Sequence, residues 1–338
     1  MGIPVVSVLL PVYNGAATLA EALESLRSQS MDDLEIVVVD DGSTDATGSL
    51  LASWDDPRLR VISLPHAGLL PALNTGLAAC QGEFIARMDA DDRSHETRLE
   101  EQVDLLRSDD RIGVVGCLVH SFPPQDVAEG FRIYEQWQNQ LVTHQDIARE
   151  IFIESPIAHP SAMMRRGELQ QMGGYHENGW PEDYDLWLRY HAVGRHFAKV
   201  PHVRLDWREH GARATRTDSR YSVENFLRAK AHYLLAGPLA ERNGLFVWGA
   251  GKTGRRLSKH LIRGGQPPDR FVDVADDKIG KTLRGIQIIG VEDVLSHWAE
   301  FERPILLAAV ASRGARQLIR QQLSDWGWQE GVEYLCVA

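Results

Sequence analysis

Cysteine is scarce in this chain of 338 residues, which contains only three. Cys80, Cys117 and Cys336 are too scattered to form a disulfide framework or a metal-ligand spacing, so a reducing cytoplasm is the expected compartment. Long apolar runs are also missing, since none approaches the roughly 20 residues that span a bilayer. Residues 1–10 lack a basic region and a cleavage site, and they predict a β-strand instead of a signal peptide.

Positive charge is in short supply as well, because 36 Lys and Arg residues face 47 Asp and Glu residues, for a net charge of −11. General nucleic-acid binders carry a basic footprint, so the composition argues against that class. A phosphorylated ligand would need a bound cation or local arginines to offset the repulsion. The apolar share of 43% is ordinary for a globular chain, and the length allows two domains.

The first 120 residues alternate between short apolar runs and amphipathic segments. Runs 5–12 and 34–39 are β-branched and apolar on both faces, as in buried parallel strands, and segment 16–29 spaces its leucines as a helix does. By the same criteria, strands are expected at 60–64, 84–88 and 112–118, and helices at 45–54, 69–79 and 98–107. This order predicts a mostly parallel sheet flanked by helices, with ligands at the carboxyl ends of its strands.

A second α/β pattern begins at Leu245, where strand 245–248 runs into a glycine turn and a helix. Because Gly and Pro end a helix near 238–244, the sequence predicts two domains, residues 1–238 and 245–338. Between the two patterns we expect a loop at 121–130, an interrupted amphipathic helix at 131–152 and an irregular, charged segment at 204–220. Later strands are expected at 271–273, 286–289 and 304–310.

Residues that could contact a nucleotide follow the first two predicted strands. Pro11, Tyr13 and Asn14 end the first strand, and Asp40 ends the second. Tyr13 can stack on a planar base, and Asp40 can accept a hydrogen bond from a pyrimidine N–H. The alternative rests on Asp41-Gly42-Ser43, which follows Asp40 and is also good turn and helix-capping chemistry.

Paired carboxylates follow the strand at 84–88. Asp89 and Asp91 alternate along an extended segment, so both project to the same side and offer hard oxygen ligands to Mg²⁺ or Mn²⁺. Such an ion would also neutralise a diphosphate. The alternative is a solvated acidic loop that caps the next helix.

Residues 5–118 resemble the family 2 glycosyltransferases of the GT-A fold. The matching pieces are Val-Ser-Val-Leu-Leu-Pro-Val-Tyr-Asn (6–14), Val-Val-Asp-Asp-Gly-Ser-Thr-Asp (38–45), Ala-Leu-Asn-Thr-Gly-Leu (72–77) and Gly-Glu-Phe-Ile-Ala-Arg-Met-Asp-Ala-Asp-Asp (82–92). The resemblance implies that Asp89 and Asp91 bind the ribose and the metal, and that Asp40 and the Pro11–Tyr13 turn contact the base. A departure is His95-Glu-Thr, where relatives often have Pro.

The resemblance continues to about residue 215. It is carried by His-Pro-Ser-Ala-Met-Met-Arg-Arg (159–166), Gly-Gly-Tyr (173–175), Trp-Pro-Glu-Asp-Tyr-Asp-Leu-Trp-Leu-Arg (180–189) and Trp-Arg-Glu-His (207–210). It implies that Asp183 is the catalytic base, with Asp185 as its competitor, and that His210 reaches the metal or the diphosphate. Glu182, His159 and Gly174 would support the acceptor site. From the residues alone, acids at 182 and 183 need only favour the helix dipole.

The second domain has its own glycine turn. Gly249, Gly251 and Gly254 follow a strand, and Asp273 ends the next strand, where an acid would meet a ribose hydroxyl. This context is typical of a Rossmann-like domain, yet a lone GxGxxG is weak evidence for binding. A scaffolding or oligomerising module explains the pattern at least as well.

The sequence therefore predicts an inverting, metal-dependent transferase that moves a sugar from a nucleoside diphosphate sugar, UDP-sugar favoured, to the hydroxyl of a glycan, a lipid-linked acceptor or another molecule. Cell-surface polysaccharide or glycoconjugate synthesis at the inner face of the membrane is the expected setting, with a homo-oligomer allowed. The alternatives are a nucleotide-dependent oxidoreductase centred on the second domain and a non-catalytic sugar-nucleotide-binding protein. A glycoside hydrolase would need no nucleotide site.

Overall fold

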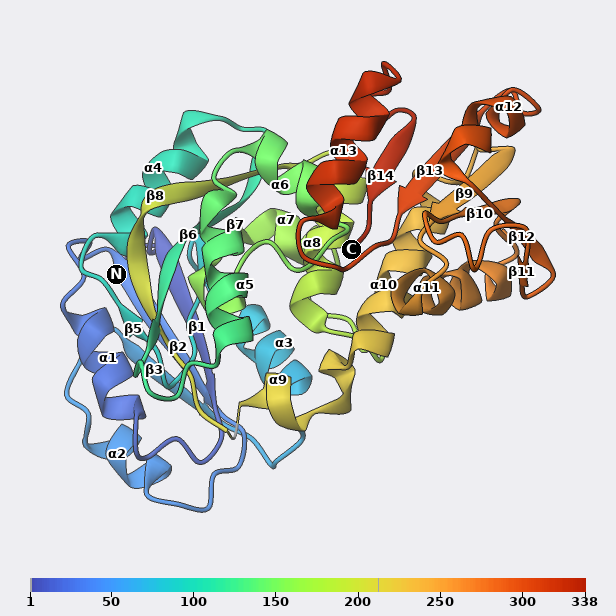
Figure 1. Ribbon diagram of the computed structural model, residues 1–338. Helices are drawn as coiled ribbons and strands as arrows, with labels where there is room; N and C mark the ends of the chain where they lie inside the picture. The colour runs from blue at the N-terminus through green and yellow to red at the C-terminus, as the bar shows by residue number, and fades with distance from the viewer. Residues whose placement is uncertain (1, 212) are drawn as a thin grey trace. The chain divides into compact units, whose positions relative to one another are not determined.

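The computed structural model describes residues 2–211 and 213–338, which form two compact units (Figure 1). The first unit comprises residues up to Ala148, Pro156–Asn178 and Glu182–Thr217, and the second comprises Arg149–Ser155, Gly179–Pro181 and Asp218–Ala338. Helix α10 (Val223–Ala236) therefore belongs to the second unit, whereas the sequence predicts a boundary after this helix. The domain limits 1–238 and 245–338 stay a prediction.

The first unit is built on an eight-stranded sheet in the order β3-β2-β1-β4-β7-β6-β8-β5. Its strands are β1 (Val6–Val12), β2 (Leu34–Asp40), β3 (Leu59–Ser63), β4 (Phe84–Arg87), β5 (Arg93–Ser94), β6 (Ile112–Phe122), β7 (Met163–Arg165) and β8 (His196–Arg208). The pairs β3–β2, β2–β1, β1–β4 and β6–β8 are parallel, and β7 runs antiparallel between β4 and β6. The predicted mostly parallel sheet is confirmed.

Helices cover both faces of this sheet (Figure 1). The helices up to Thr217 are α1 (Leu19–Arg27), α2 (Thr47–Ser53), α3 (Leu69–Ala79), α4 (Arg98–Ser108), α5 (Glu129–Gln140), α6 (His144–Glu150), α7 (Arg166–Gln171), α8 (Glu182–Ala192) and α9 (Ala214–Thr217), of which α1, α3, α4 and α5 pack on the strands. Val8 and Leu10 of β1 join one core with Leu23 of α1. On the opposite face Leu9 meets α3 so closely that a Cβ at Gly76 would lie 2.2 Å from it. Burial on both faces explains the apolar runs of the strands.

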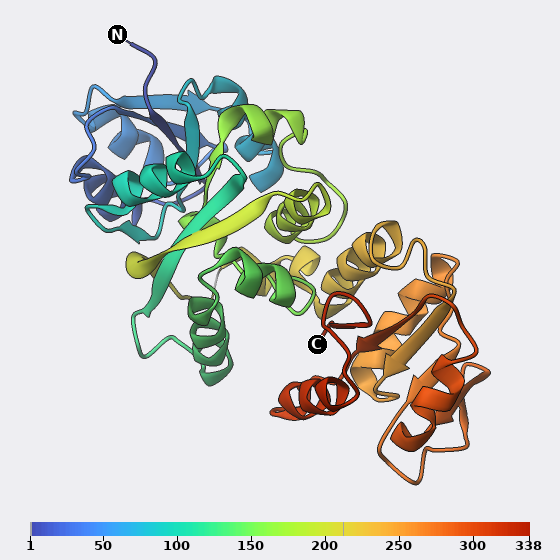
Figure 2. The ribbon, with the colours of Figure 1, turned by 90° about the horizontal axis from the view of Figure 1, so that it is seen from above.

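Two expectations about the middle of the chain are wrong in detail. Strand β6 extends to Phe122 and α5 begins at Glu129, so the predicted loop at 121–130 is shorter. Strand β8 runs to Arg208, into the segment expected to be irregular from residue 204. The two long strands pair from Ile112 to Phe122 and lie side by side (Figure 2). Pairing with a central strand overrides the charged composition of this segment.

The second unit contains a six-stranded sheet in the order β11-β12-β10-β9-β13-β14. Its elements are β9 (Gly244–Trp248), α11 (Lys252–Arg263), β10 (Arg270–Val272), β11 (Thr282–Leu283), β12 (Ile286–Ile289), α12 (Val294–Trp298), β13 (Pro304–Ala308), α13 (Ala315–Asp325) and β14 (Tyr334–Cys336). All neighbours are parallel except the β11–β12 pair. Among the described residues, no helix combines the length and apolarity needed to cross a membrane.

Candidate active site

The predicted site residues in the turns after β1, β2 and β4 lie at one edge of the sheet. Strands β1, β2 and β4 are parallel neighbours in register, with Leu9 opposite Val37 on one side and Arg87 on the other. The loops after Val12, Asp40 and Arg87 therefore begin at the same edge of the sheet, the edge where parallel α/β sheets bind ligands.

An aromatic surface forms at the end of β1. The ring of Tyr13 is 48% exposed and stacks on the ring of His66, with centroids 4.0 Å apart and planes 20° apart. Tyr13 therefore presents one open face to a planar ligand. His66 follows β3 and was not singled out from the sequence, although the end of a third parallel strand was the available signal.

The turn after β2 is tied to the turn after β1. Asn14 adopts a left-handed φ of 53°, its N–H donates to Ser43 Oγ at 2.8 Å, and its Oδ1 accepts from the Thr44 N–H at 2.8 Å. Asp40 Oδ1 accepts from the Ser43 N–H at 2.9 Å. Pro11 is buried within β1 opposite Val39, so its part is to position the turn and not to present a side chain.

Asp41, for which the sequence indicated turn or helix-capping chemistry, holds a turn in the structure. Its two carboxylate oxygens accept from the backbone N–H groups of Ala67 and Gly68 at 2.8 Å, and Oδ2 lies 2.9 Å from His66 Nδ1. This carboxylate fixes the turn after β3 beside Tyr13.

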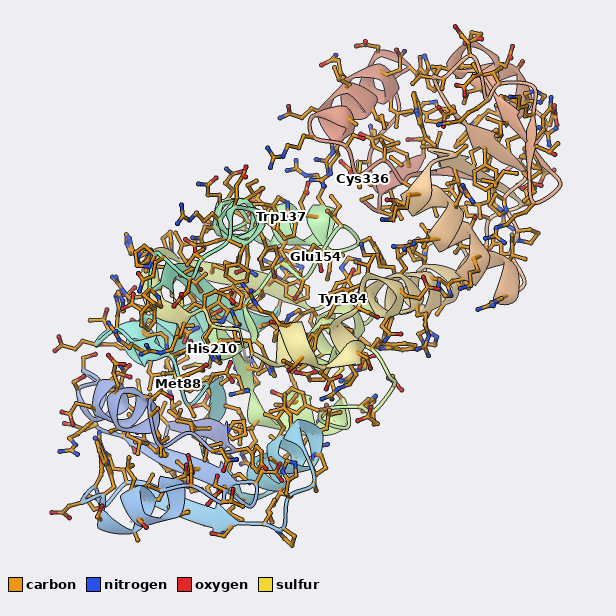
Figure 3. The ribbon with its side chains drawn as sticks, turned by 60° about the horizontal axis from the view of Figure 1, so that its bottom comes forward. Met88, Trp137, Glu154, Tyr184, His210 and Cys336 are labelled. Carbon is orange, nitrogen blue, oxygen red and sulfur yellow. The ribbon has the colours of Figure 1, made fainter. Side chains whose placement is uncertain are left out.

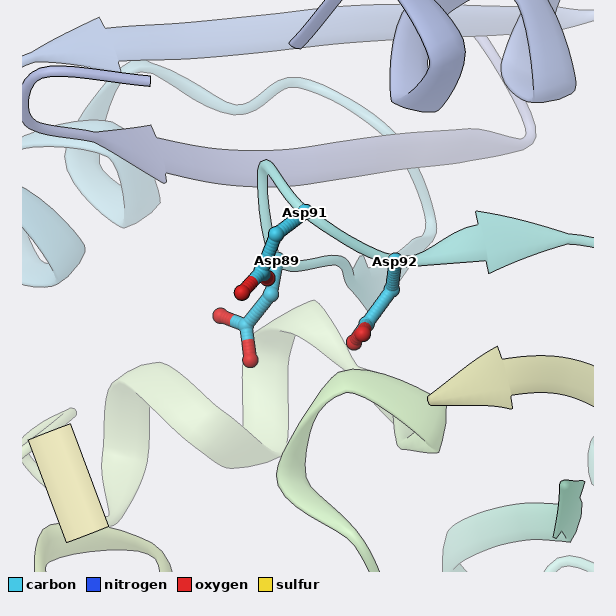
Figure 4. Close-up of side chains that lie close together, drawn as sticks. All are labelled: Asp89, Asp91 and Asp92. Atoms are coloured by element: carbon cyan, nitrogen blue, oxygen red, sulfur yellow. The ribbon is translucent and has the colours of Figure 1, made fainter. Parts of the chain in front are cut away.

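Three carboxylates project from the loop after β4 (Figure 4). One oxygen from each of Asp89, Asp91 and Asp92 lies within 4.8 Å of the others, and no other such group of His, Cys, Asp or Glu occurs among the described residues. The buried Arg87 donates to Asp89 Oδ1 at 2.6 Å. Asp89 and Asp91 were predicted as a pair, and Asp92 is an addition from the structure.

The electrostatics of this cluster fit a divalent cation. Burial raises the pKa of Asp91, and the charge of Asp89 raises it further. Burial raises the pKa of Asp92 well above its usual value, with further increases from Asp91 and Asp89. Among the residues that the structure describes, none offers a hydrogen bond to the buried Asp92 Oδ2. Crowded carboxylates with a spare oxygen supply the hard ligands that Mg²⁺ or Mn²⁺ prefers, and a cation would relieve their repulsion.

The end of β8 reaches back to this acidic loop. His210 Nε2 lies 2.8 Å from Asp91 Oδ2, although the two residues are 119 positions apart. Arg208 donates its Nε–H to Asp91 O at 2.6 Å and its backbone N–H to Asp92 Oδ1 at 2.7 Å. Figure 3 places His210 beside Met88, at the start of the loop. The structure thus brings together Asp91 and His210, the two residues predicted to bind the metal.

Glu182 begins α8 and faces a buried polar cluster. His159 Nδ1 lies 3.7 Å from Glu182 Oε1, and its Nε2 lies 3.1 Å from Tyr175 Oη. Burial lowers the pKa of His159 well below its usual value, and the positive charge of Arg87 lowers it further. His159 therefore contacts Glu182 and Tyr175 as a neutral imidazole, and its predicted support of the acceptor site stays a prediction.

Asp183 and Asp185 occupy different environments. Asp183 is half-buried and its Oδ1 accepts from the Tyr184 N–H at 2.7 Å. Asp185 is fully buried, where its carboxylate accepts from Arg189 Nε at 2.8 Å and from Asn178 Nδ2 at 3.1 Å. A carboxylate inside a buried ion pair is poorly placed to take a proton from a substrate, whereas Asp183 retains access to solvent.

Gly174 holds the loop beside α8 in a conformation that a side chain would disturb. Its φ is +68°, and a Cβ would lie 2.6 Å from Asn74 Oδ1. The side chain of Asn74 accepts from the Tyr175 N–H at 2.9 Å and donates to Tyr175 O at 2.8 Å. Gly174 therefore supports the position of Tyr175 through its backbone.

The glycine turn of the second unit is shaped by close packing. A Cβ at Gly254 would lie 1.9 Å from Gly249 O, and Gly249 itself has a φ of +115°. Gly251 differs, because a Cβ there would meet nothing within 4 Å. The first and third glycines are thus explained by the fold alone.

Asp273 is engaged within the same turn. Its Oδ2 accepts from the Ala250 N–H at 3.0 Å and from Lys278 Nζ at 2.9 Å. These contacts engage the carboxylate that a dinucleotide site would use to accept a hydrogen bond from a ribose hydroxyl.

The parallel sheet with an acidic loop at its carboxyl edge defines the class: it is the architecture of GT-A glycosyltransferases. S. aureus TarS, solved in complex with UDP-GlcNAc, matches 76% of this chain and 72% of its own at a TM-score of 0.57 and 18% identity. The mannosyltransferase PcManGT from Pyrobaculum calidifontis, solved with GDP-Man and Mn²⁺, matches 79% of this chain and 67% of its own, at a TM-score of 0.50 and 23% identity. These likenesses show the fold.

The sequence comparisons identify the family. The family model described as glycosyl transferase family 2 matches residues 7–172. A glycosyltransferase of Haemophilus influenzae is 30% identical over 235 residues, which is 67% of this chain and 71% of the relative. The amylovoran biosynthesis glycosyltransferase AmsE of Erwinia amylovora is 30% identical over 58% of this chain and 73% of its own. The chain belongs to glycosyltransferase family 2 and is a glycosyltransferase.

Proposed function

We propose that this protein transfers a sugar from a nucleoside diphosphate sugar to an acceptor hydroxyl, with inversion at the anomeric carbon. The observation that carries the proposal is the carboxylate cluster of Asp89, Asp91 and Asp92, which lies at the same edge of the sheet as the exposed ring of Tyr13. Further support comes from the UDP-GlcNAc complex of TarS, which shares the fold. A uridine donor is favoured.

The donor base stacks on the exposed face of Tyr13. Asp40 Oδ1 is engaged by Ser43, so its Oδ2 is the oxygen that accepts from the base N–H. Asp89 lies next along the edge, within reach of the ribose, and Arg87 holds its carboxylate in place. These side chains bind and orient the donor.

Asp91, Asp92 and His210 would hold the divalent ion, Mn²⁺ or Mg²⁺. When bound there, the ion supplies Lewis-acid stabilisation of the departing diphosphate. Asp183 takes the proton from the acceptor hydroxyl as that oxygen attacks the anomeric carbon. A single displacement from the opposite face inverts the configuration.

The acceptor is a glycan, a lipid-linked sugar or another hydroxyl compound. The name of the relative AmsE refers to amylovoran biosynthesis, which supports a role in making a cell-surface polysaccharide or glycoconjugate. We place the reaction in the cytoplasm, at the inner face of the membrane.

A screen of nucleotide sugars tests the proposal. Purified protein is incubated with each donor and Mn²⁺ or Mg²⁺, and nucleoside diphosphate release is measured with and without EDTA. We expect release from one donor class, suppressed by the chelator, and an NMR spectrum of the product with the opposite anomeric configuration to the donor. Release that EDTA does not change, or a product that retains configuration, would contradict the proposal.

The glycine turn of the second unit is not required for transfer in this proposal. Replacing Gly251 with valine is expected to change the transfer rate less than twofold, because the new side chain meets open space while blocking close approach of a phosphate. The transfer rate of the variant is measured by steady-state kinetics without added nicotinamide cofactor. Its donor affinity is measured by calorimetry on the same protein. A folded Gly251→Val protein that binds donor and loses transfer would make this turn a working nucleotide site.

A further inference from the structure

Helix α11 concentrates positive charge in a chain that is otherwise acidic. Five of its twelve residues are basic and none is acidic. Residues 245–338 contain 13 Lys and Arg against 11 Asp and Glu, whereas residues 1–244 contain 23 against 36. The helix is therefore a local reversal of the overall charge.

The basic residues of α11 share one face. They are Lys252, Arg255, Arg256, Lys259 and Arg263, spaced three, four, seven and eleven positions from the first. The opposite face is buried through Leu257 and Leu261. The charged stripe is about 16 Å long at 1.5 Å per residue.

Most of these charges have no ion-pair partner among the described residues. In residues 2–211 and 213–338, only Lys259 of the five forms an ion pair, with Glu224 at 2.6 Å. Arg284, in the turn between β11 and β12, adds a further cation, and its Nη2 donates to Arg255 O at 3.4 Å. Unpaired cations held side by side repel one another, so an external array of anions would stabilise them.

A hollow lies within this face. Lys259, Ile262, Arg263 and Arg284 line a depression of about 400 Å³. Because Lys259 is paired with Glu224, Arg263 and Arg284 are the two cations of this hollow that remain for an external anion.

We propose that the cationic face, defined as Lys252, Arg255, Arg256, Arg263 and Arg284, docks the protein on a bilayer surface rich in anionic phospholipid. The length of the stripe favours a surface with many phosphates over a single phosphate ion. Each basic residue near an anionic bilayer strengthens binding by about fivefold. The inference is independent of the proposed transfer reaction, because none of these residues belongs to the carboxylate edge.

Vesicle sedimentation with the full-length protein tests the proposal. We expect binding to vesicles of phosphatidylcholine with 30% phosphatidylglycerol (about that fraction gives a strongly negative surface), no binding to pure phosphatidylcholine, and release in about 0.5 M NaCl. The variant Arg255→Gln/Arg256→Gln should bind about 25-fold more weakly, because two contributions of about fivefold each are lost. Both arginines are exposed, so the fold should persist.

A matched variant, Arg107→Gln/Arg303→Gln, removes the same charge from arginines that pair with Glu83 and Glu241. It should bind the anionic vesicles like the wild type, and both variants should keep wild-type transfer to a water-soluble acceptor. Failure of the wild type to bind, or equal weakening by both variants, would overturn the proposal. Release of the protein from vesicles by inorganic phosphate at matched ionic strength would show that the face binds single phosphate ions, and it would overturn the proposal. A dimer that depends on α11, in a protein that does not bind vesicles, would assign the face to a second copy of the chain and would also overturn the proposal.

Discussion

Replacing Asp91 with asparagine is expected to abolish metal-dependent donor binding and to lower turnover about a thousandfold, while the protein stays folded. Several kcal/mol of charge stabilisation depends on an ion bound there, and each 1.4 kcal/mol is a factor of about ten in rate. The apo protein should not lose stability, because burial and Asp89 raise the pKa of Asp91 and its negative charge is therefore unfavourable in the fold.

Calorimetric titration with donor and Mn²⁺ measures the loss of donor binding. Thermal denaturation with and without Mn²⁺ measures the stability of the apo protein and its gain on binding the ion. In the wild type, Mn²⁺ at about 100 times its dissociation constant should add about 2.7 kcal/mol of stability, and the variant should show no such gain. Asp104→Asn removes an exposed carboxylate from α4 and serves as the charge control. Unchanged Mn²⁺ and donor affinity in Asp91→Asn would remove the metal site from this loop.

The core of the first unit was predictable because its strands are buried on both faces. Such strands appear as uninterrupted β-branched runs, and the motifs at their ends fall at one edge by the geometry of a parallel sheet. Tyr13, Asp40 and Asp89 lie at the same edge because each follows one of three neighbouring parallel strands, β1, β2 and β4.

The other half of the sheet was not predictable in the same way. Strands β5 and β7 contain two and three residues, too few to show a period. Strand β8 is charged near its end and becomes a strand through its pairing with β6. The contacts of Arg208 and His210 with the acidic loop depend on that pairing, so local sequence could not reveal them without the family resemblance.

Spacing also could not separate the two acids of α8. Asp183 and Asp185 both fall in the first turn, where either would favour the helix dipole. What distinguishes them is Arg189, one turn later, which holds Asp185 in a buried ion pair. The i,i+4 spacing allows this pair in any helix, but its burial depends on packing against the loop at Gly174, whose carbonyl also accepts from Arg189.

Replacing Asp183 with asparagine is expected to leave donor affinity within about threefold of the wild type and to lower the transfer rate by a factor of about 10² to 10⁴. The amide oxygen can still accept from the Tyr184 N–H, so the start of α8 is preserved. The amide cannot accept the proton of the attacking hydroxyl. Donor titration and single-turnover transfer, measured on the same preparation, separate binding from chemistry.

Asp185→Asn should behave in the opposite way and is the matched comparison. Loss of this carboxylate leaves Arg189 without its buried partner, which costs roughly 3–5 kcal/mol of stability, so the melting temperature should fall while the folded fraction still transfers sugar. Asp183→Asn should melt like the wild type. If Asp183→Asn instead turns over at a near-normal rate with donor bound, and Asp185→Asn stays folded and inactive, the base is Asp185 and the buried ion pair must open during the reaction.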